Sequence, residues 1–374
     1  MLQIDEIRTL REFEALRDTW HELQQAAGAR SVFLSHEWFL VCAQCLSPSQ
    51  QMLVLVLRRE GRPVGAVPLL SQRIQVRHLP ATQIGFLENP LTPFVDFLLT
   101  EREEGLRTVL GYFRETHTDW DVLSLGKLRE DSPHLDLLRR LLGHQRQTFR
   151  VLTVSQTPFL RIQQSWEEFY QSKSQKFKKT RRSVANRIER LGPVAVELVR
   201  RPEECARGLE QLLEVSQRSW KRQQATDLLT PEFERKFLGQ LTGVVSNAGW
   251  LRLWLLKKGE DVLAAEYHLD DHGAVYALRA HYDDAYAASS PGAYLDTMIV
   301  RHLFENGCTL YDMGPGRVDY KLAWTNSVYC CYSLEIYNQT FYSQLLGRLE
   351  TRWIPALKAS PLGRWLEKRP EQIE

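Results

Sequence analysis

The most constraining feature of this 374-residue sequence is that one order of secondary-structure signals occurs twice. In each copy, predicted helices come first, a meander of about three strands follows, and a helix then leads to a last strand. Matching glycines, such as Gly126 and Gly314, lie roughly 190 residues apart. A strand reached through a crossover helix runs parallel to its neighbour. The chain is therefore predicted to contain two copies of one α/β unit, each with a mixed sheet.

The expected elements of the first copy are two helices, three strands, a helix and a last strand, over residues 9–26, 35–45, 52–58, 64–70, 74–79, 103–116 and 120–125. The second copy is expected to have a strand over 194–199, a helix over 202–220, a helix from 230, strands over 250–256, 262–269 and 274–281, a helix over 291–305 and a strand over 308–312. We therefore predict an N-terminal domain over residues 1–155, a second domain over 156–340 and a helical tail over 341–374.

Charge and hydropathy narrow the class of protein. Lys and Arg number 48 and Asp and Glu 46, so the formal net charge of +2 gives no overall attraction to nucleic acid or to a bilayer. The longest apolar run, Met52–Leu57, is far too short to span a membrane, and the acidic start of the chain lacks the pattern of a signal peptide. We expect a cytoplasmic protein without a transmembrane segment, whose six cysteines are reduced thiols. Cys42 and Cys45 have no second pair to complete a zinc site, so no metal is predicted.

The second copy has an unusual helix start at Ser289-Ser290-Pro291-Gly292-Ala293. Pro suits the first helical turn, and the small residues leave backbone N–H groups open to an anion, which the helix dipole also favours. A pyrophosphate would fit there, although an ordinary capped helix gives the same pattern. The matching helix of the first copy begins with carboxylates between Glu101 and Glu104, which would repel a phosphate. If either copy binds an anionic cofactor, we expect it to be the second, with the first a degenerate copy.

The predicted hairpin of the second copy carries ionisable side chains. Strand alternation, with Glu266 opposite Ala277, would place Glu266, His268, Arg279 and His281 on one face. Such a face either lies in solvent or lines a cleft, and in a sheet covered by helices we expect the cleft.

Asp312 ends the last strand of the second copy, where ligand sites of α/β sheets concentrate. Gly314 and Gly316 permit a sharp turn after it. Asp312 could accept a proton or orient an amine, Tyr320 could donate a proton to a leaving thiolate, and Lys321 could hold a phosphate or carboxylate. The simpler alternative is a glycine turn with an Asp–Lys ion pair.

A basic stretch runs from Lys173 to Arg190 on a predicted helix. A charged run is usually a solvated helix face. Here the charge surrounds the helix, which argues against ordinary core packing and suggests an anionic neighbour: cofactor phosphates, a polyanionic acceptor or RNA. No RNA-binding signature accompanies it, so nucleic acid is the less favoured partner.

Several of these segments together resemble the CelD-like acetyltransferases of the GNAT superfamily, which are named for a link to bacterial cellulose biosynthesis. The resemblance covers about Phe159–Leu334, which includes the basic stretch. In the first half it is limited to the layout and to Phe33–Trp38. The pairing of two such halves is also similar to the Fem peptidoglycan aminoacyltransferases. The segments that carry the resemblance are Tyr282-Asp283-Asp284-Ala285-Tyr286, Ser290-Pro291-Gly292, Asp312-Met313-Gly314-Pro315-Gly316, Tyr320-Lys321 and Ser174 to Arg182.

The resemblance implies two tandem GNAT-like units that move an acyl group, acetyl in the first place, from acyl-coenzyme A. The implied acceptor is an amine or hydroxyl of a sugar, a polysaccharide precursor or another small molecule. Two alternatives stay open: a Fem-like transferase that uses aminoacyl-tRNA, and a non-catalytic scaffold in polysaccharide biosynthesis. The candidate residues are His281, Glu266, Asp312 and Tyr320 for catalysis; Ser289, Ser290, Pro291, Gly292, Ala293 and Lys321 for coenzyme A; and Arg279, Tyr282 and Trp38 for the acceptor.

Overall fold

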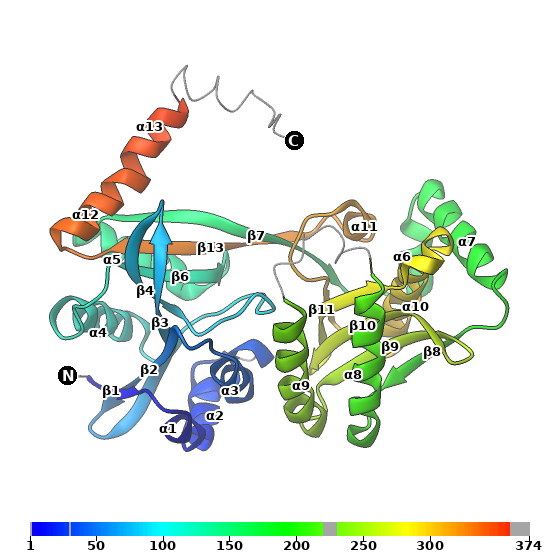
Figure 1. The fold of residues 1–374 in the computed structure, drawn as a ribbon, viewed down its shortest axis with the longest axis horizontal. Coiled ribbons are helices and arrows are strands. Elements are labelled where there is room, and N and C mark those ends of the chain that lie inside the picture. Colours follow the sequence, from blue (N-terminus) through cyan, green and yellow to red (C-terminus); the bar gives the residue numbers. More distant parts are fainter. Residues whose placement is uncertain (1, 30, 220–229, 360–374) are drawn as a thin grey trace.

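The computed structural model describes residues 2–29, 31–219 and 230–359. Two α/β halves lie side by side and share one long twisted sheet (Figure 1). The sheet has the strand order β1-β2-β3-β4-β6-β13-β7-β12-β11-β10-β9-β8, with β5 paired to β3.

The first half begins with helices and continues with a meander. Thr9 and Glu12 cap its first helix reciprocally, and the run Met52–Leu57 is buried inside β2. Its elements are β1 (Gln3–Ile7), α1 (Leu10–Glu14), α2 (Arg17–Ala26), η1 (Val32–Leu34), α3 (His36–Gln44), β2 (Gln50–Arg59), β3 (Arg62–Val76), β4 (Leu79–Phe86), β5 (Leu98–Leu99), α4 (Arg102–Glu115), β6 (Val122–Arg129) and α5 (Pro133–His144).

The rest of the chain repeats this order and adds a tail. In both copies a crossover helix leads to a strand parallel to the last strand of the meander: β6 beside β4, and β12 beside β11. The predicted repeat of mixed α/β units is thereby confirmed. The elements are β7 (Phe149–Arg161), α6 (Trp166–Ser172), α7 (Gln175–Glu189), β8 (Ala195–Val199), α8 (Pro202–Gln217), α9 (Pro231–Asn247), β9 (Leu251–Lys258), β10 (Asp261–Asp271), β11 (Ala274–Tyr282), η3 (Asp284–Ser289), α10 (Pro291–Glu305), β12 (Leu310–Asp312), α11 (Asp319–Leu322), β13 (Val328–Tyr337), α12 (Phe341–Arg348), η4 (Leu349–Trp353) and α13 (Ile354–Ala359).

Local predictions failed where turns were hard to see in the sequence. The strand expected over 74–79 is wrong, because β3 runs to Val76 and the next strand begins at Leu79. Arg77 and His78 make the turn between them with φ angles of 52° and 65°, a backbone conformation more typical of glycine. The helix expected over 9–26 is two helices. The helix expected to reach position 220 ends at Gln217, and position 220 lies outside the described residues.

Strands β7 and β13 join the two halves. β13 lies between β6 and β7, so a late segment of the chain completes the sheet of the first half. β7 pairs with β13 over most of its length and with β12 through Phe159, Leu160 and Arg161 (Figure 1). The predicted boundary between residues 155 and 156 falls inside β7, and the predicted domain division stays a prediction.

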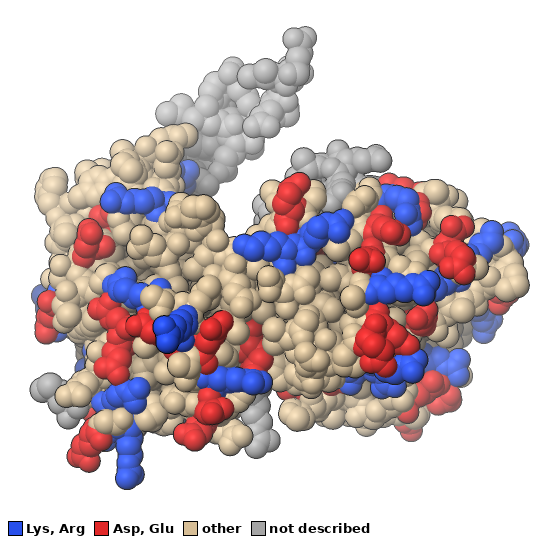
Figure 2. Space-filling view, turned by 60° about the horizontal axis from the view of Figure 1, so that its bottom comes forward, with Lys and Arg blue, Asp and Glu red and all other residues tan. Residues whose placement is uncertain are grey.

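The basic helix α7 packs against α10. Phe177, Val184 and Ile188 form its buried stripe, and Lys178 and Arg181 are buried with them. The interpretation that charge around every face opposes core packing is therefore wrong, because the apolar residues recur at helical spacing. Figure 2 shows both signs of charge interspersed over the face in view, which therefore carries no single-sign field.

The sequence predicted no transmembrane segment and six reduced cysteines, and the structure can be compared with both predictions. Within residues 2–29, 31–219 and 230–359, no helix combines the length and the apolarity needed to cross a bilayer. All six cysteines are free thiols, and four of them are buried.

Because β13 is the centre of the shared sheet, its core side chains should matter to global stability. Leu334 is fully buried, and Leu334→Ala should lower the free energy of unfolding by about 2–5 kcal/mol. The exposed Leu345 in α12 is the matched control, and Leu345→Ala should cost about 0.5 kcal/mol or less. Urea unfolding of both variants measures the difference, and equal small losses would contradict a central role for β13.

Candidate active site

The parallel strands β11 and β12 separate early. They pair only at Ala274 with Leu310, Val275 with Tyr311 and Tyr276 with Asp312, after which β12 ends and β11 continues to Tyr282. Gly314 has a φ of +72°, and a Cβ there would lie 2.7 Å from the carbonyl oxygen of Ala277. Only glycine fits so close to β11 in this conformation, so the chain turns away at this point and the two strands diverge.

Asp312 and Lys321 hold this glycine turn from two sides. The buried carboxylate of Asp312 accepts hydrogen bonds from the Gly314 N–H at 2.9 Å and from the Tyr329 hydroxyl at 2.6 Å. Burial raises the pKa of Asp312, against these hydrogen bonds, which favour its ionised form. The Lys321 ammonium donates to the carbonyl oxygens of Gly314 and Pro315, both at 2.9 Å. The predicted roles of Asp312 as base and of Lys321 as phosphate ligand stay predictions.

The start of α10 differs from an ordinary capped helix. Ser290 has left-handed backbone angles (φ 57°, ψ 53°) and its side chain caps no N–H. Its hydroxyl instead accepts a hydrogen bond of 2.9 Å from the Arg187 guanidinium of α7. Tyr282 packs against Gly292, where a Cβ would come within 3.3 Å of the ring. The first-turn N–H groups of Gly292 and Ala293 therefore lie at a helix start that carries a guanidinium close by.

The expected register of the β10–β11 hairpin is wrong. Glu266 lies opposite Ala280, and Tyr267 opposite Arg279, whereas His268 lies opposite Ala277. The extra residue, Leu278, makes a bulge on β11 that reverses the alternation of side chains beyond it. The four ionisable side chains therefore divide between the two faces of the sheet instead of sharing one.

Arg279 and His281 face helix α9. The Arg279 Nε lies 2.5 Å from the Glu234 carboxylate, and the His281 Nε2 lies 3.4 Å from the same oxygen. Burial opposes ionisation of Glu234, but the hydrogen bond from His281 and the charge of Arg279 outweigh it and hold the pKa of Glu234 at about 2. In the sequence, Glu234 is marked only as an acidic residue in the first turn of a helix, so its pairing with β11 could not be predicted.

Glu266 and His268 face α10. The Glu266 carboxylate lies 2.9 Å from the His268 Nε2, and both residues are buried. On α10, the Asp296 carboxylate accepts a hydrogen bond of 2.5 Å from the indole N–H of Trp324. Burial and the nearby charge of Glu266 raise the pKa of Asp296 to about 7, against the opposing influence of Arg181, Trp324 and Lys321.

Tyr320 and Lys321, from the segment that follows β12, lie near the carboxylates of Glu266 and Asp296. Lys321 lies close enough to Asp296 to affect its ionisation, and its ammonium is 5.9 Å from the ring of Tyr320. Tyr320 is 54% exposed, so it lies at the surface of a cluster whose other members are buried. Asp296 and Trp324 were missed by sequence reasoning, because an acidic residue in a helix and an aromatic in a loop are each unremarkable alone.

Trp38 lies away from this cluster. It is 1% exposed, and the centroid of its ring lies 4.8 Å from that of Phe33 and 5.5 Å from that of Phe237. Its predicted part in acceptor binding stays a prediction. Within the described ranges of the chain, no group of three or more His, Cys, Asp or Glu side chains is arranged to hold a metal ion.

The depressed pKa of Glu234 gives a pH-dependent contribution to stability. The folded pKa of about 2 lies below the ordinary 4.5, so the stabilisation is complete above pH 4.5 and is lost as the pH falls toward 2. Glu234→Gln should therefore lower the free energy of unfolding at pH 7 by about 2–3 kcal/mol, and by less at pH 4 and below.

Chemical unfolding at several pH values measures this contribution. Glu232→Gln, an exposed carboxylate in the same helical turn, is the control and should change little. A loss for Glu234→Gln that stays constant with pH would contradict the assigned pairing.

The chain was compared with protein families and with solved structures. Residues 175–322 match the family model described as Acetyltransferase (GNAT) domain. The chain is similar to FemX, with 12% identity and a TM-score of 0.57 over 91% of this chain and 100% of that one. It is also similar to a conserved protein of unknown function from Bacteroides thetaiotaomicron VPI-5482, with 12% identity and a TM-score of 0.56 over 90% and 100% of the two chains.

A further structure, the C-terminal DUF2156 domain of a proposed lysylphosphatidylglycerol synthetase from Agrobacterium fabrum, has 12% identity and a TM-score of 0.53 over 95% and 99% of the two chains. At this identity the structural likenesses show the fold alone. No curated protein matches the sequence. Residues 175–322, in the second half of the chain, are thus similar to a GNAT acetyltransferase domain, and the chain as a whole shares the two-unit α/β fold of FemX.

Proposed function

We propose that this protein transfers an acyl group from acyl-coenzyme A to an amine or hydroxyl of a small acceptor. A sugar or polysaccharide precursor, used in the cytoplasm, is the acceptor that the CelD-like resemblance favours. One observation carries the proposal: β11 leads from its separation from β12, through the short helix η3, to a helix start with a guanidinium beside it. An opening between strands and an anion site then follow one another along one segment of chain.

The donor would use the helix start for its phosphates. A pyrophosphate needs N–H donors and positive charge, and both are present at Gly292, Ala293 and Arg187. Two other nearby cations already donate hydrogen bonds to the protein. Lys321 donates to the glycine turn, and Arg181 donates to the Ala293 carbonyl and the Thr297 hydroxyl. Arg187 is therefore the guanidinium that we assign to the coenzyme A phosphates.

The transfer itself needs a proton acceptor and a proton donor. The acceptor nitrogen or oxygen attacks the thioester carbonyl, the carbon–sulfur bond breaks, and one proton moves from the nucleophile to the protein while the thiolate gains one. We assign the proton acceptor to Asp296, because burial and the charge of the neighbouring Glu266 raise its pKa to about 7, close to neutral pH. Tyr320, the exposed phenol beside them, is the proposed donor to the thiolate.

The remaining candidates receive supporting roles in this proposal. Both carboxylate oxygens of Asp312 already accept hydrogen bonds, so Asp312 fixes the opening between the strands. His281 shares Glu234 with Arg279 on the α9 face and positions the end of β11.

An aminoacyl-tRNA-dependent transfer, as in Fem proteins, is the second candidate. The exposed cations Lys176, Lys179, Arg182 and Arg190 on α7 favour it, because they could contact a nucleic-acid backbone. Tight tRNA binding that weakens steeply with salt, together with no coenzyme A binding, would select this candidate over the first. Unchanged cellular function on loss of Asp296 would select the non-catalytic scaffold.

Arg187 should bind the donor, whereas its neighbour Arg190 should not. Arg187→Ala should weaken coenzyme A binding about tenfold, because one charge-assisted contact to phosphate is lost. Arg190→Ala, an exposed cation at the end of the same helix, is the control for general charge. Isothermal titration calorimetry with coenzyme A measures the affinity of both variants. Equal losses of affinity would mean that positive charge in general, and not Arg187 in particular, attracts the phosphates.

The raised pKa of Asp296 predicts the pH dependence of transfer. Because Asp296 accepts the proton only when it is ionised, kcat/KM should rise as the pH increases through about 7. Asp296→Asn should lower kcat/KM by about 100-fold or more and remove this rise. Thiol release from acetyl-coenzyme A, with an acceptor found by screening amines and sugars, measures the rate.

Glu305→Gln, at an exposed carboxylate of the same helix, is the control and should keep the wild-type pH profile. An unchanged profile in Asp296→Asn would overturn the assignment of the proton acceptor.

A further inference from the structure

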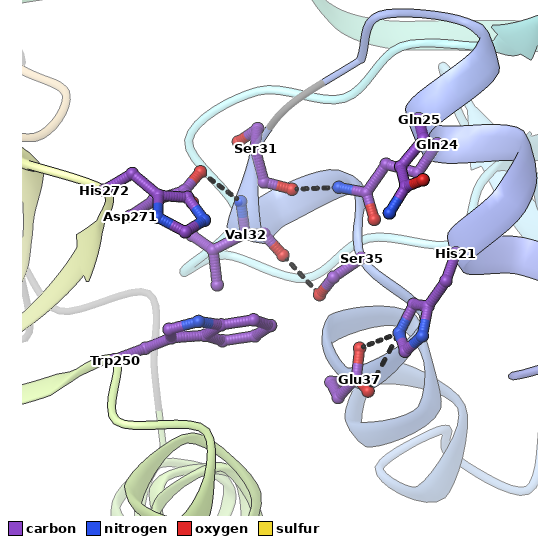
Figure 3. A pocket seen from close by; sticks show the side chains of 10 residues that line it. All are labelled: His21, Gln24, Gln25, Ser31, Val32, Ser35, Glu37, Trp250, Asp271 and His272. Atoms are coloured by element: carbon purple, nitrogen blue, oxygen red, sulfur yellow. Dashed lines mark hydrogen bonds and ion pairs between the residues drawn. The ribbon is translucent and has the colours of Figure 1, made fainter. Parts of the chain in front are cut away.

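A cavity of about 560 Å³ lies between the two halves, apart from the helix start of α10. The first half contributes residues of α2, η1 and α3, and the second contributes Trp250 and the turn between β10 and β11. Figure 3 shows the indole of Trp250 extending beneath Val32 and His272, with Gln24, Gln25 and His21 across the cavity from them. Its size is within the range of small-molecule sites.

The two walls of the cavity are tied together across the join. The Asp271 carboxylate, from the second half, accepts a hydrogen bond of 3.1 Å from the backbone N–H of Val32 in the first. Phe33, the residue after Val32, also contacts the second half: its ring lies edge to face with the Tyr276 ring, with 5.0 Å between the ring centroids. The cavity is therefore preformed, and its two walls do not depend on a ligand to meet.

Two carboxylates, Glu37 and Asp271, lie in the walls of the cavity. Glu37 contacts both Arg17 and His21 at 3.1 Å. Asp271 accepts the hydrogen bond from Val32 and lies 4.0 Å from His272, and the described residues that line the cavity include no Lys or Arg. A phosphate would therefore meet two carboxylates and no Lys or Arg from the described lining, which argues against a phosphate as the ligand.

What the cavity offers is an aromatic ring surrounded by groups that both donate and accept hydrogen bonds. Gln24 uses one amide N–H on the Ser31 carbonyl at 2.8 Å, and its amide oxygen has no protein donor among the described residues. Gln25 also lines the cavity, and the His272 ring, which lies 4.0 Å from the Asp271 carboxylate, is largely exposed. A sugar ring has this combination: C–H groups for an aromatic ring, and hydroxyls that donate and accept at its edge.

The cavity also lies close to the point where β11 and β12 separate. Asp271 pairs with Ala274, and Tyr276, two residues further along β11, pairs with Asp312. That step is about 7 Å along the strand. A second cavity of about 400 Å³ shares Ser31 with the first and is lined by Tyr276 and Arg129. The Arg129 guanidinium lies 4.4 Å from the Tyr329 ring, and Tyr329 donates to Asp312.

We propose that the cavity lined by Trp250, Asp271, Gln24 and Gln25 binds a saccharide and anchors the acceptor beside the transfer site. The anchoring role rests on the proposed acyl transfer, whereas the binding itself does not. The first half then has a role of its own, because it supplies most of the acceptor site while the second supplies the donor site.

Binding of disaccharides without any acyl donor tests the site. Cellobiose and N,N′-diacetylchitobiose should be titrated into the full-length protein by calorimetry, with intrinsic tryptophan fluorescence as a second readout. At least one should bind saturably, and Trp250→Ala should weaken that binding about tenfold. Trp353→Ala, which removes a 54% exposed tryptophan far along the chain, is the matched control and should bind like the wild type.

Gln25→Ala is the milder second variant, since it alters an exposed side chain and should also weaken binding with unchanged thermal unfolding. Three results would overturn the proposal: no saturable binding of either disaccharide, equal binding by Trp250→Ala and the wild type, or Trp250-dependent binding of spermidine in place of sugars. Coenzyme A titration of the same variants separates the two proposals. Saccharide binding that persists without coenzyme A binding would leave this site standing and remove the acyl-transfer function.

Discussion

The hydrogen bonding of β13 between β6 and β7 is the constraint on which the rest of the structure depends. It makes two α/β units into one sheet, because a strand from the end of the chain fills a central place in the first half. β7 then passes from β13 to β12 without a break. The relative placement of the halves is fixed by backbone ladders rather than by a loose linker, so a cavity between them has stable walls.

The two copies differ most clearly at the start of their crossover helices. In the first copy, Arg59 pairs with Glu101 and Glu104, so the helix start is neutralised by its own chain. In the second, Ser290 is turned away from the helix and contacts Arg187 of α7. The same element is thus closed to an anion in one copy and open to one in the other.

A single extra residue, Leu278, decides which groups meet across the second half. Without the bulge, Glu266 and His281 would lie on one face, as the alternating pattern predicts. With it, the α9 face receives Arg279 and His281 with Glu234, and the α10 face receives Glu266 and His268 with Asp296. The proposed proton acceptor and the contacts of Glu234 therefore lie on opposite faces of the sheet.

The sequence by itself determined the repeated α/β order, the position of most elements and the contrast between the two helix starts. These follow from local periodicity, proline and charge, which act within a few residues. Tertiary structure alone decided the return of β13 to the first half, the bulge at Leu278, and the meeting of Asp296, Trp324 and Lys321. The cavity beside Trp250 belongs to this second group, because its walls are more than 200 residues apart in sequence and meet through contacts such as the hydrogen bond that the Val32 N–H donates to Asp271. Such contacts depend on packing between distant segments, which no local pattern records.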